Sequence, residues 1–162
     1  TNRASAITDA LAILSMSIIS AEFENLRHFN LDKTSRENLL FASTLSGMVI
    51  ANTGTTIVHS LGYPLTYSRK TEHGKANGFL ICSYLNFLQS KGCTKLGLLL
   101  MKLPDIDALK CIIDELLGER EKLSDDEIEL FAEKAMQSKN LNNCIIVPDK
   151  ADTVKMLYES FK

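Results

Sequence analysis

The sequence lacks several features that would assign a protein to a class at once. It has no tryptophan, only three prolines and a net charge of only −2 among 162 residues. No apolar run approaches the roughly 18 residues that a membrane-spanning helix needs, and the longest candidate is 96–101. The small net charge offers no basic surface that could follow a phosphate backbone. The composition therefore argues against a membrane protein and against a nucleic-acid-binding protein.

The cysteines and the start of the chain exclude a secreted disulfide scaffold. Cys82, Cys93, Cys111 and Cys144 are spread out without a CxxC pair, which is typical of reduced, buried cysteines in a cytosolic protein. No apolar leader with a cleavage site precedes the first helical pattern, so we expect a cytoplasmic protein. The sequence opens on Thr1 rather than on methionine, in the middle of a helical pattern. We therefore expect it to be a piece of a longer protein.

Helical periodicity is what the sequence does contain. Hydrophobic residues make up 45% and charged residues 23%, an ordinary globular composition, and the length fits one domain, 1–162. Apolar residues recur at steps of three and four along most of the chain. The run 144–147 is too isolated to form a sheet. The sequence predicts an all-α domain, a multi-helical bundle of about six to eight helices. The expected helices are 6–28, 35–61, 73–89, part of 94–103, 105–117, 125–136 and 149–161.

Some helix ends are marked by particular residues. Ser124 and Glu127 form a strong capping box. Pro64 lacks an amide hydrogen, which predicts that the second helix ends or kinks at 62–63. His28 lies near the end of the first helix, where the helix dipole favours a cation, so we expect it to be structural. A weaker capping signal at Ser35 marks the start of the second helix.

The stretch 45–80 contains the candidate metal-binding residues. It holds five of the eight glycines and two of the three histidines, His59 and His73, fourteen positions apart. Imidazole is the commonest neutral metal ligand and suits iron or zinc. A helix, a turn and a returning helix would bring both rings toward one point. The spacing alone leaves a metal site and two isolated polar residues both open, because two ligands do not complete a coordination sphere.

The same stretch resembles the iron-containing (group III) alcohol dehydrogenase family. The residues that match in type and spacing are Val58-His59, Pro64-Leu65 and His73-Gly74-Lys75-Ala76-Asn77. Further matches upstream are Gly47-Met48, Asn52-Thr53-Gly54 and the run 8–12. The resemblance covers most of residues 5–90 and thins out toward the C-terminus.

This resemblance implies the C-terminal helical domain of the dehydroquinate synthase-like/iron-containing alcohol dehydrogenase fold. Such enzymes hold a divalent metal, Fe²⁺ first and Zn²⁺ as the second choice, with one aspartate and three histidines, and two of these histidines fall on His59 and His73. The other two ligands would precede Thr1. So would the nucleotide-binding domain, because this chain has no glycine-rich dinucleotide turn. NAD or NADP would be bound mainly by that domain, so we assign no cofactor-binding residue here.

Two more positions are implicated through the resemblance. Tyr63 stands four residues after His59, where many members have a second histidine facing the substrate. A tyrosine there could line the pocket and hydrogen-bond the substrate, but it is a poorer proton relay than imidazole. Ile50 falls where the family often has an apolar pocket residue, and a plain core position is equally open.

The resemblance implies that this chain is part of a metal-dependent oxidoreductase. The reaction would transfer a hydride between a small alcohol, or an aldehyde or ketone, and a nicotinamide cofactor. The missing N-terminal domain would be its partner, and a homo-oligomer is compatible with the sequence. The 162 residues alone are expected to be inactive. The alternatives are a glycerol dehydrogenase-like or dehydroquinate synthase-like metalloenzyme domain, or a non-catalytic helical interaction module.

Overall fold

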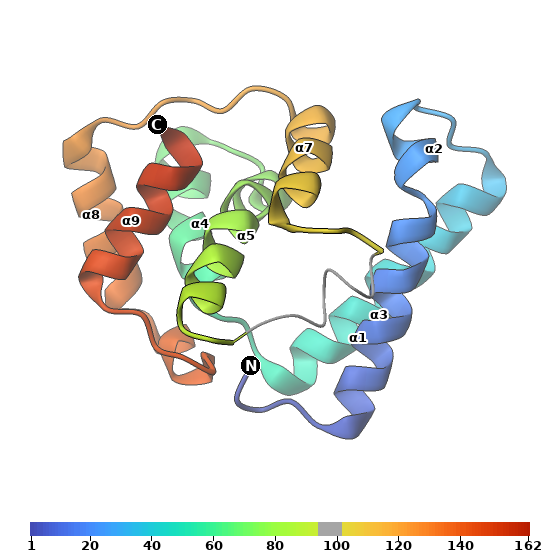
Figure 1. Ribbon diagram of the computed structural model, residues 1–162, viewed down its shortest axis with the longest axis horizontal. Helices are drawn as coiled ribbons and strands as arrows, with labels where there is room; N and C mark the ends of the chain where they lie inside the picture. The colour runs from blue at the N-terminus through green and yellow to red at the C-terminus, as the bar shows by residue number, and fades with distance from the viewer. Residues whose placement is uncertain (94–101) are drawn as a thin grey trace. The chain divides into compact units, whose positions relative to one another are not determined.

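The computed structural model describes residues 1–93 and 102–162, and its regular structure there is entirely helical (Figure 1). The all-α prediction is confirmed, while most of the expected partial helix 94–103 falls outside the described residues. No helix in these two ranges is long and apolar enough to cross a membrane. The helices are α1 (Ala6–Ala21), α2 (Phe23–Arg27), α3 (Lys33–Thr53), α4 (Ile57–Arg69), α5 (His73–Ser90), α7 (Ile106–Leu117), α8 (Asp125–Met136) and α9 (Lys150–Phe161), with a short 3-10 helix, η1 (Lys139–Asn143).

The chain folds into two compact units. The first, which we call the histidine unit, contains α4, α5, α8, η1 and α9, and the second contains α1, α2, α3 and nearly all of α7. In the histidine unit, α4 packs against α5 and α8, and α9 packs against α5 and α8. The side chains that are fully buried in its core include Ile57, Leu61, Leu80, Ile128, Phe131, Met156 and Leu157.

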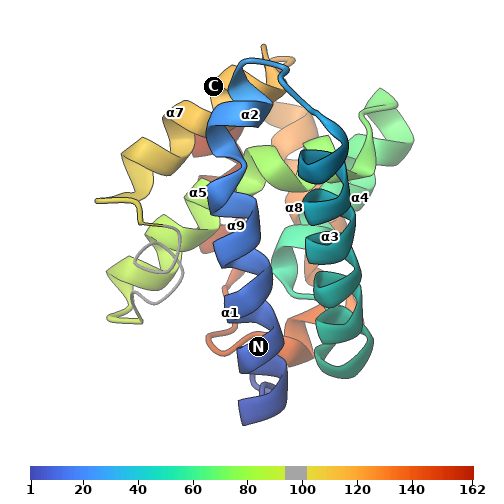
Figure 2. The ribbon, with the colours of Figure 1, turned by 90° about the vertical axis from the view of Figure 1, so that its right-hand side faces the viewer.

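The second unit is built around α1 and α3, which lie side by side (Figures 1 and 2). Small residues allow the two helices to approach closely. The hydroxyl of buried Ser15 donates to the carbonyl of Ala42 at 2.8 Å and lies 2.7 Å from the hydroxyl of Ser46.

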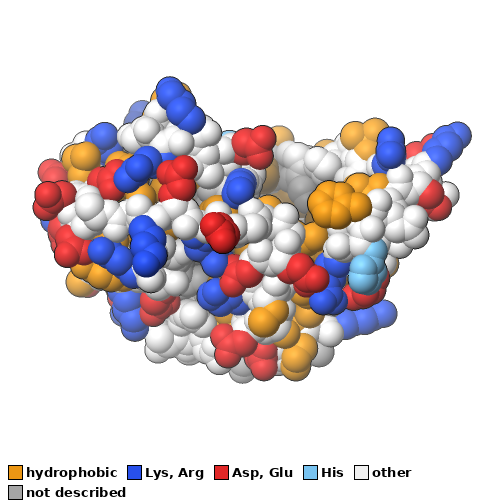
Figure 3. Space-filling model, turned by 90° about the horizontal axis from the view of Figure 1, so that it is seen from above, with side chains coloured by type: hydrophobic (Ala, Val, Ile, Leu, Met, Phe, Trp, Pro, Cys, Tyr) orange, Lys and Arg blue, Asp and Glu red, His pale blue; other side chains and the backbone are white. Residues whose placement is uncertain are grey.

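The face seen in Figure 3 carries Lys or Arg and Asp or Glu side chains interspersed, without a patch of one sign.

The second predicted helix is two helices, and its break lies earlier than expected. Gly54 ends α3 with φ 69° and ψ −174°, a region that is essentially restricted to glycine. Pro64, which was expected to end the helix, lies inside α4. It cannot donate to the carbonyl of Ser60, but Leu61 and Leu65 beside it are buried. Packing on both sides of the proline therefore keeps α4 helical through the predicted end at 62–63.

Other helix ends agree with the sequence in part. The Ser124 capping box is present, but α3 begins at Lys33 behind Asp32, whose side chain accepts from the amide of Ser35. The first predicted helix is interrupted at Glu22. This buried carboxylate accepts from the side-chain amides of Asn25 and Asn38 at 2.8 and 2.7 Å. These hydrogen bonds lower the pKa of Glu22. The hydrogen bond from Asn38 also connects the interruption between α1 and α2 to α3.

The cysteines and His28 occupy different environments. None of the four cysteines is in a disulfide bond, but only Cys82 and Cys144 are buried, and Cys111 is exposed on α7. The expectation of uniform burial was therefore wrong, because Cys111 lies on the outer side of an amphipathic helix. His28 caps the C-terminal end of α2, and its Nε2 lies 3.4 Å from the carboxylate of Glu24.

Candidate functional site

The structure brings His59 and His73 together. His59 is the third residue of α4 and His73 is the first residue of α5. The connection reverses the chain through Lys70, which is in the left-handed conformation with φ 58°. Nδ1 of His59 lies 3.1 Å from Nε2 of His73, and the ring centroids are 5.1 Å apart. A helix, a turn and a returning helix thus place two ring nitrogens at one point.

Asn77 completes this cluster from the next turn of α5. Its side-chain nitrogen Nδ2 lies 3.3 Å from Nδ1 of His59 and 3.1 Å from Nε2 of His73. Its oxygen Oδ1 is buried and has no hydrogen-bond partner among the residues that the structure describes. The sequence analysis quoted Asn77 within the matching motif but gave it no role. The available signal was its position four residues after His73, which places both side chains on one face of a helix.

Gly62 makes room for the Asn77 amide. A Cβ built on Gly62 would lie 2.2 Å from Oδ1 of Asn77, a separation that no side chain tolerates. Because Gly62 has no side chain, the amide of Asn77 can lie against α4 at this position.

Tyr63 and Thr66 flank the second histidine. The ring of Tyr63 stacks on His73 with centroids 5.4 Å apart and an interplanar angle of 10°. Tyr63 is 41% exposed, so its ring forms an open edge of the site rather than core. Oγ1 of Thr66 donates to the carbonyl of Gly62 at 3.0 Å and lies 3.5 Å from Nδ1 of His73.

The surroundings of His59 favour its neutral imidazole. Partial burial, and after it the proximity of His73, lowers the pKa of His59. Burial disfavours the charged ring and a neighbouring cation would repel it. The lowered pKa of His59 favours the unprotonated ring, which is the form of imidazole that binds metal ions.

The two nitrogens fit a pair of ligands to one ion. Nitrogens bound at about 2.1 Å to one ion lie about 3.0–3.4 Å apart in octahedral or tetrahedral arrangements, and the observed separation is 3.1 Å. Residues 1–93 and 102–162 contain no group of three or more histidine, cysteine, aspartate or glutamate side chains that could hold a metal. Within these ranges, His59 and His73 could supply two ligands to an ion but not a complete set.

Ile50, the other predicted pocket residue, lies on α3 in the second unit. It is 44% exposed, so the alternative of a plain core position does not hold within the part of the chain that the structure describes.

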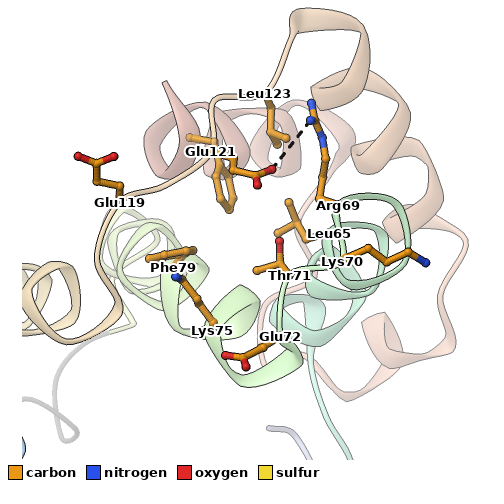
Figure 4. Close-up of a pocket in the computed structure, with 11 residues that line it drawn as sticks. Leu65, Arg69, Lys70, Thr71, Glu72, Lys75, Phe79, Glu119, Glu121 and Leu123 are labelled. Carbon is orange, nitrogen blue, oxygen red and sulfur yellow. Dashed lines mark ion pairs between the residues drawn. The ribbon is translucent and has the colours of Figure 1, made fainter.

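A separate pocket of about 260 Å³ lies beside the turn between α4 and α5 in the histidine unit (Figure 4). Its lining does not include His59, Tyr63, His73 or Asn77. Its wall carries charges of both signs, and Arg69 there pairs with Glu121 at 3.9 Å. Its lining residues include Leu65, Arg69, Lys75, Phe79, Glu119 and Leu123.

Comparison with known proteins agrees with the motif around the histidines. The family model described as Fe-containing alcohol dehydrogenase family, C-terminal, matches residues 1–161. The chain is 30% identical over 92 residues to long-chain-alcohol dehydrogenase 1 of Geobacillus thermodenitrificans, covering 57% of this chain and 23% of that protein. It is 38% identical over 80 residues to the aldehyde-alcohol dehydrogenase of Streptococcus pneumoniae, covering 48% of this chain and 9% of that protein.

A solved structure extends the likeness to the whole described fold. The iron-containing alcohol dehydrogenase of Thermotoga maritima superposes with a TM-score of 0.86 at 29% identity, covering 98% of this chain and 44% of that one. The chain thus spans less than half the length of that relative. With the family model matching almost every residue, the chain belongs to the Fe-containing alcohol dehydrogenase family and corresponds to its C-terminal helical part.

Proposed function

We propose that this chain is the helical part of a metal- and NAD(P)-dependent alcohol dehydrogenase, and that His59 and His73 supply two of its metal ligands. The observation that carries the proposal is the 3.1 Å separation of the two ring nitrogens, in a chain of this family. A bound Fe²⁺, or Zn²⁺ as the second choice, would act as a Lewis acid on the alcohol or carbonyl oxygen. The nicotinamide would carry the hydride.

The chain's own residues position these reactants. His59 and His73 present two ring nitrogens from α4 and α5, and the packing of these two helices against each other keeps the separation of the nitrogens fixed. Tyr63 offers a hydroxyl and an exposed ring beside His73, where it would line the pocket for a small alcohol or aldehyde. Ile50 is the second residue that we propose for the substrate pocket. The remaining ligands and most of the cofactor contacts belong to an N-terminal domain, the partner that this half-length chain requires.

Replacing each histidine in the full-length protein tests the proposal. We expect His59→Ala and His73→Ala each to lower bound iron or zinc to well below one equivalent and to abolish turnover. His28→Ala is the matched control, because His28 is exposed at the end of α2 in the second unit. It should retain both metal and activity. Unchanged metal content in both site variants would instead favour a helical interaction module with vestigial histidines.

A further inference from the structure

The segment that carries His73 has little contact with the hydrophobic core. Leu65 near the end of α4 and Ala76 in the first turn of α5 are buried, but none of residues 66–75 is. The helix α5 begins at His73, and the side chain of Glu72 before it makes no capping hydrogen bond. The backbone hydrogen bond from Thr71 to Leu65 is long, at 3.4 Å. Neither burial nor a side-chain cap therefore fixes the start of α5.

Arg69 forms an ion pair within this segment. Its Nη2 contacts both carboxylate oxygens of Glu127, at 2.5 and 2.6 Å. The carboxylate of Glu121 lies farther away, 3.9 Å from Nη1 (Figure 4). The side chains of Arg69 and Glu127 are only 35% and 27% exposed, so solvent screens this pair less than a pair on the open surface. The end of α4 is thus connected to α8 by charge, at a point where apolar packing is missing.

Glu127 is itself held in place by the start of α8. Its Oε2 accepts from the backbone amide and the hydroxyl of Ser124 at 2.9 and 3.1 Å, which closes the capping box of this helix. The next residue, Ile128, is fully buried. The carboxylate therefore has a defined position without Arg69, which reduces the side-chain entropy that the pair must lose.

Two other contacts hold the ring of His73. Tyr63 stacks on it, and the side-chain nitrogen of Asn77 lies 3.1 Å from its Nε2. Tyr63 is itself exposed, and Asn77 lies on the same helix as His73. These contacts orient the ring, whereas Arg69 connects the backbone four residues before His73 to a third helix.

We infer that Arg69 is a positioning residue for His73. By pairing with Glu127, it fixes the end of α4 and the turn at Lys70, and so the point at which α5 begins. His59 has no such need, because it lies in the part of α4 that contains buried residues on either side. The pair thereby maintains the 3.1 Å separation between the two histidine nitrogens. The inference rests on the proposed function only for its effect on metal binding.

The role of the pair in fixing the turn can be measured without metal. Hydrogen–deuterium exchange with mass spectrometry, on the full-length protein freed of metal by chelator, reports the local opening of backbone hydrogen bonds. We expect the amides of 70–76 to exchange about 2- to 30-fold faster in Arg69→Met. Glu127→Gln removes the charge but retains a residue that suits the capping box, so it should act in the same direction. Unchanged exchange in both variants overturns the inference.

Lys150→Met is the matched control. Lys150 of α9 pairs with Glu129 of α8 at 2.9 Å, so this substitution also removes a cation from an ion pair of α8 but leaves α4 untouched. It should change neither the exchange of 70–76 nor metal binding. Equal effects of Lys150→Met and Arg69→Met would assign the result to a general loss of stability and would overturn the inference.

Metal binding then tests whether the pair serves the site. Zn²⁺ affinity, measured by competition with a chromophoric chelator, should fall about 2- to 30-fold in Arg69→Met. Arg69→Lys should recover part of this loss, because it keeps the charge but not the planar guanidinium. With Co²⁺ bound, Arg69→Met should shift the visible absorption bands that report coordination geometry, which a loss of stability alone does not do. Unchanged affinity and bands overturn the positioning role, and Glu127→Gln decides if Arg69→Met fails to fold.

The two proposals can fail separately. Faster exchange in Arg69→Met, with metal retained in His59→Ala and His73→Ala, would overturn the metal ligation and leave the role of Arg69 in fixing the turn. Lost metal in the two histidine variants, with unchanged exchange in Arg69→Met, would do the reverse.

Discussion

Gly62 contributes to the site although it bears no functional group. Its missing side chain accommodates Oδ1 of Asn77, and through Asn77 it affects both histidines. We predict that Gly62→Ala displaces the amide, lowers the unfolding free energy by about 1–3 kcal/mol through overpacking, and weakens Zn²⁺ binding. Urea unfolding and chelator competition on the full-length protein measure the two effects.

Gly74 provides the matched control for this substitution. It lies in the first turn of α5, and an added Cβ there meets nothing within 4 Å. Gly74→Ala should be neutral or stabilising by up to about 1 kcal/mol. Equal effects of the two substitutions would show that the contact between Gly62 and Asn77 is not what matters.

The residue scale also shows what the sequence could and could not predict about the site. Helical periodicity on either side of a turn was enough to expect that His59 and His73 approach each other. It could not reveal Asn77, because the role of this amide depends on the close approach of α4 at Gly62. That approach arises from tertiary packing and is not visible in the spacing of residues along the chain.

At the scale of elements, an ion pair fastens α4 to α8. Arg69 at the end of α4 contacts both carboxylate oxygens of Glu127, at 2.5 and 2.6 Å, in the first turn of α8. The Arg69 hydrogen bond, followed by the backbone amide of Ser124, lowers the pKa of Glu127 from 4.5 to about 2. The sequence predicted the capping box but not this pair, since the partners are 58 residues apart.

This pair makes stability depend on pH in a defined direction. Because the folded pKa of Glu127 lies below its unfolded value, its contribution is complete above about pH 4.5 and is lost as the pH falls toward about 2. We predict that Glu127→Gln lowers the unfolding free energy near neutral pH and flattens its decline between these two pH values. Glu133→Gln, an exposed position on the same helix, should leave the profile unchanged. Parallel profiles for wild type and Glu127→Gln would show that the pair contributes nothing.

Helix boundaries were predictable where a local signal sufficed and not elsewhere. The end of α7 at Gly118, with φ 72°, and the caps of α8 and α9 depend on adjacent residues. The junction between α3 and α4 does not. A glycine run and a proline offered two places to break the helix, and the proline is tolerated because Leu61 and Leu65 are buried on either side of it. Only the packed structure distinguishes these positions.

At the scale of the whole molecule, the chain covers 44% of an iron-containing relative and provides two candidate ligands. Three or four ligands are needed for a stable site. We therefore predict that this chain alone is inactive and binds metal weakly. Isothermal titration of the isolated chain with Zn²⁺ should show no tight one-to-one binding. A tight equimolar isotherm would mean that the missing ligands are not required.

The central claim is that His59 and His73 are metal ligands, and X-ray absorption of the zinc-loaded full-length protein tests it most directly. The imidazole rings bound to the metal produce a multiple-scattering signal that can be counted. We predict that His59→Ala and His73→Ala each lose one imidazole from the first coordination shell, or lose the metal, while His28→Ala matches the wild type. An unchanged imidazole count in both site variants would contradict the account.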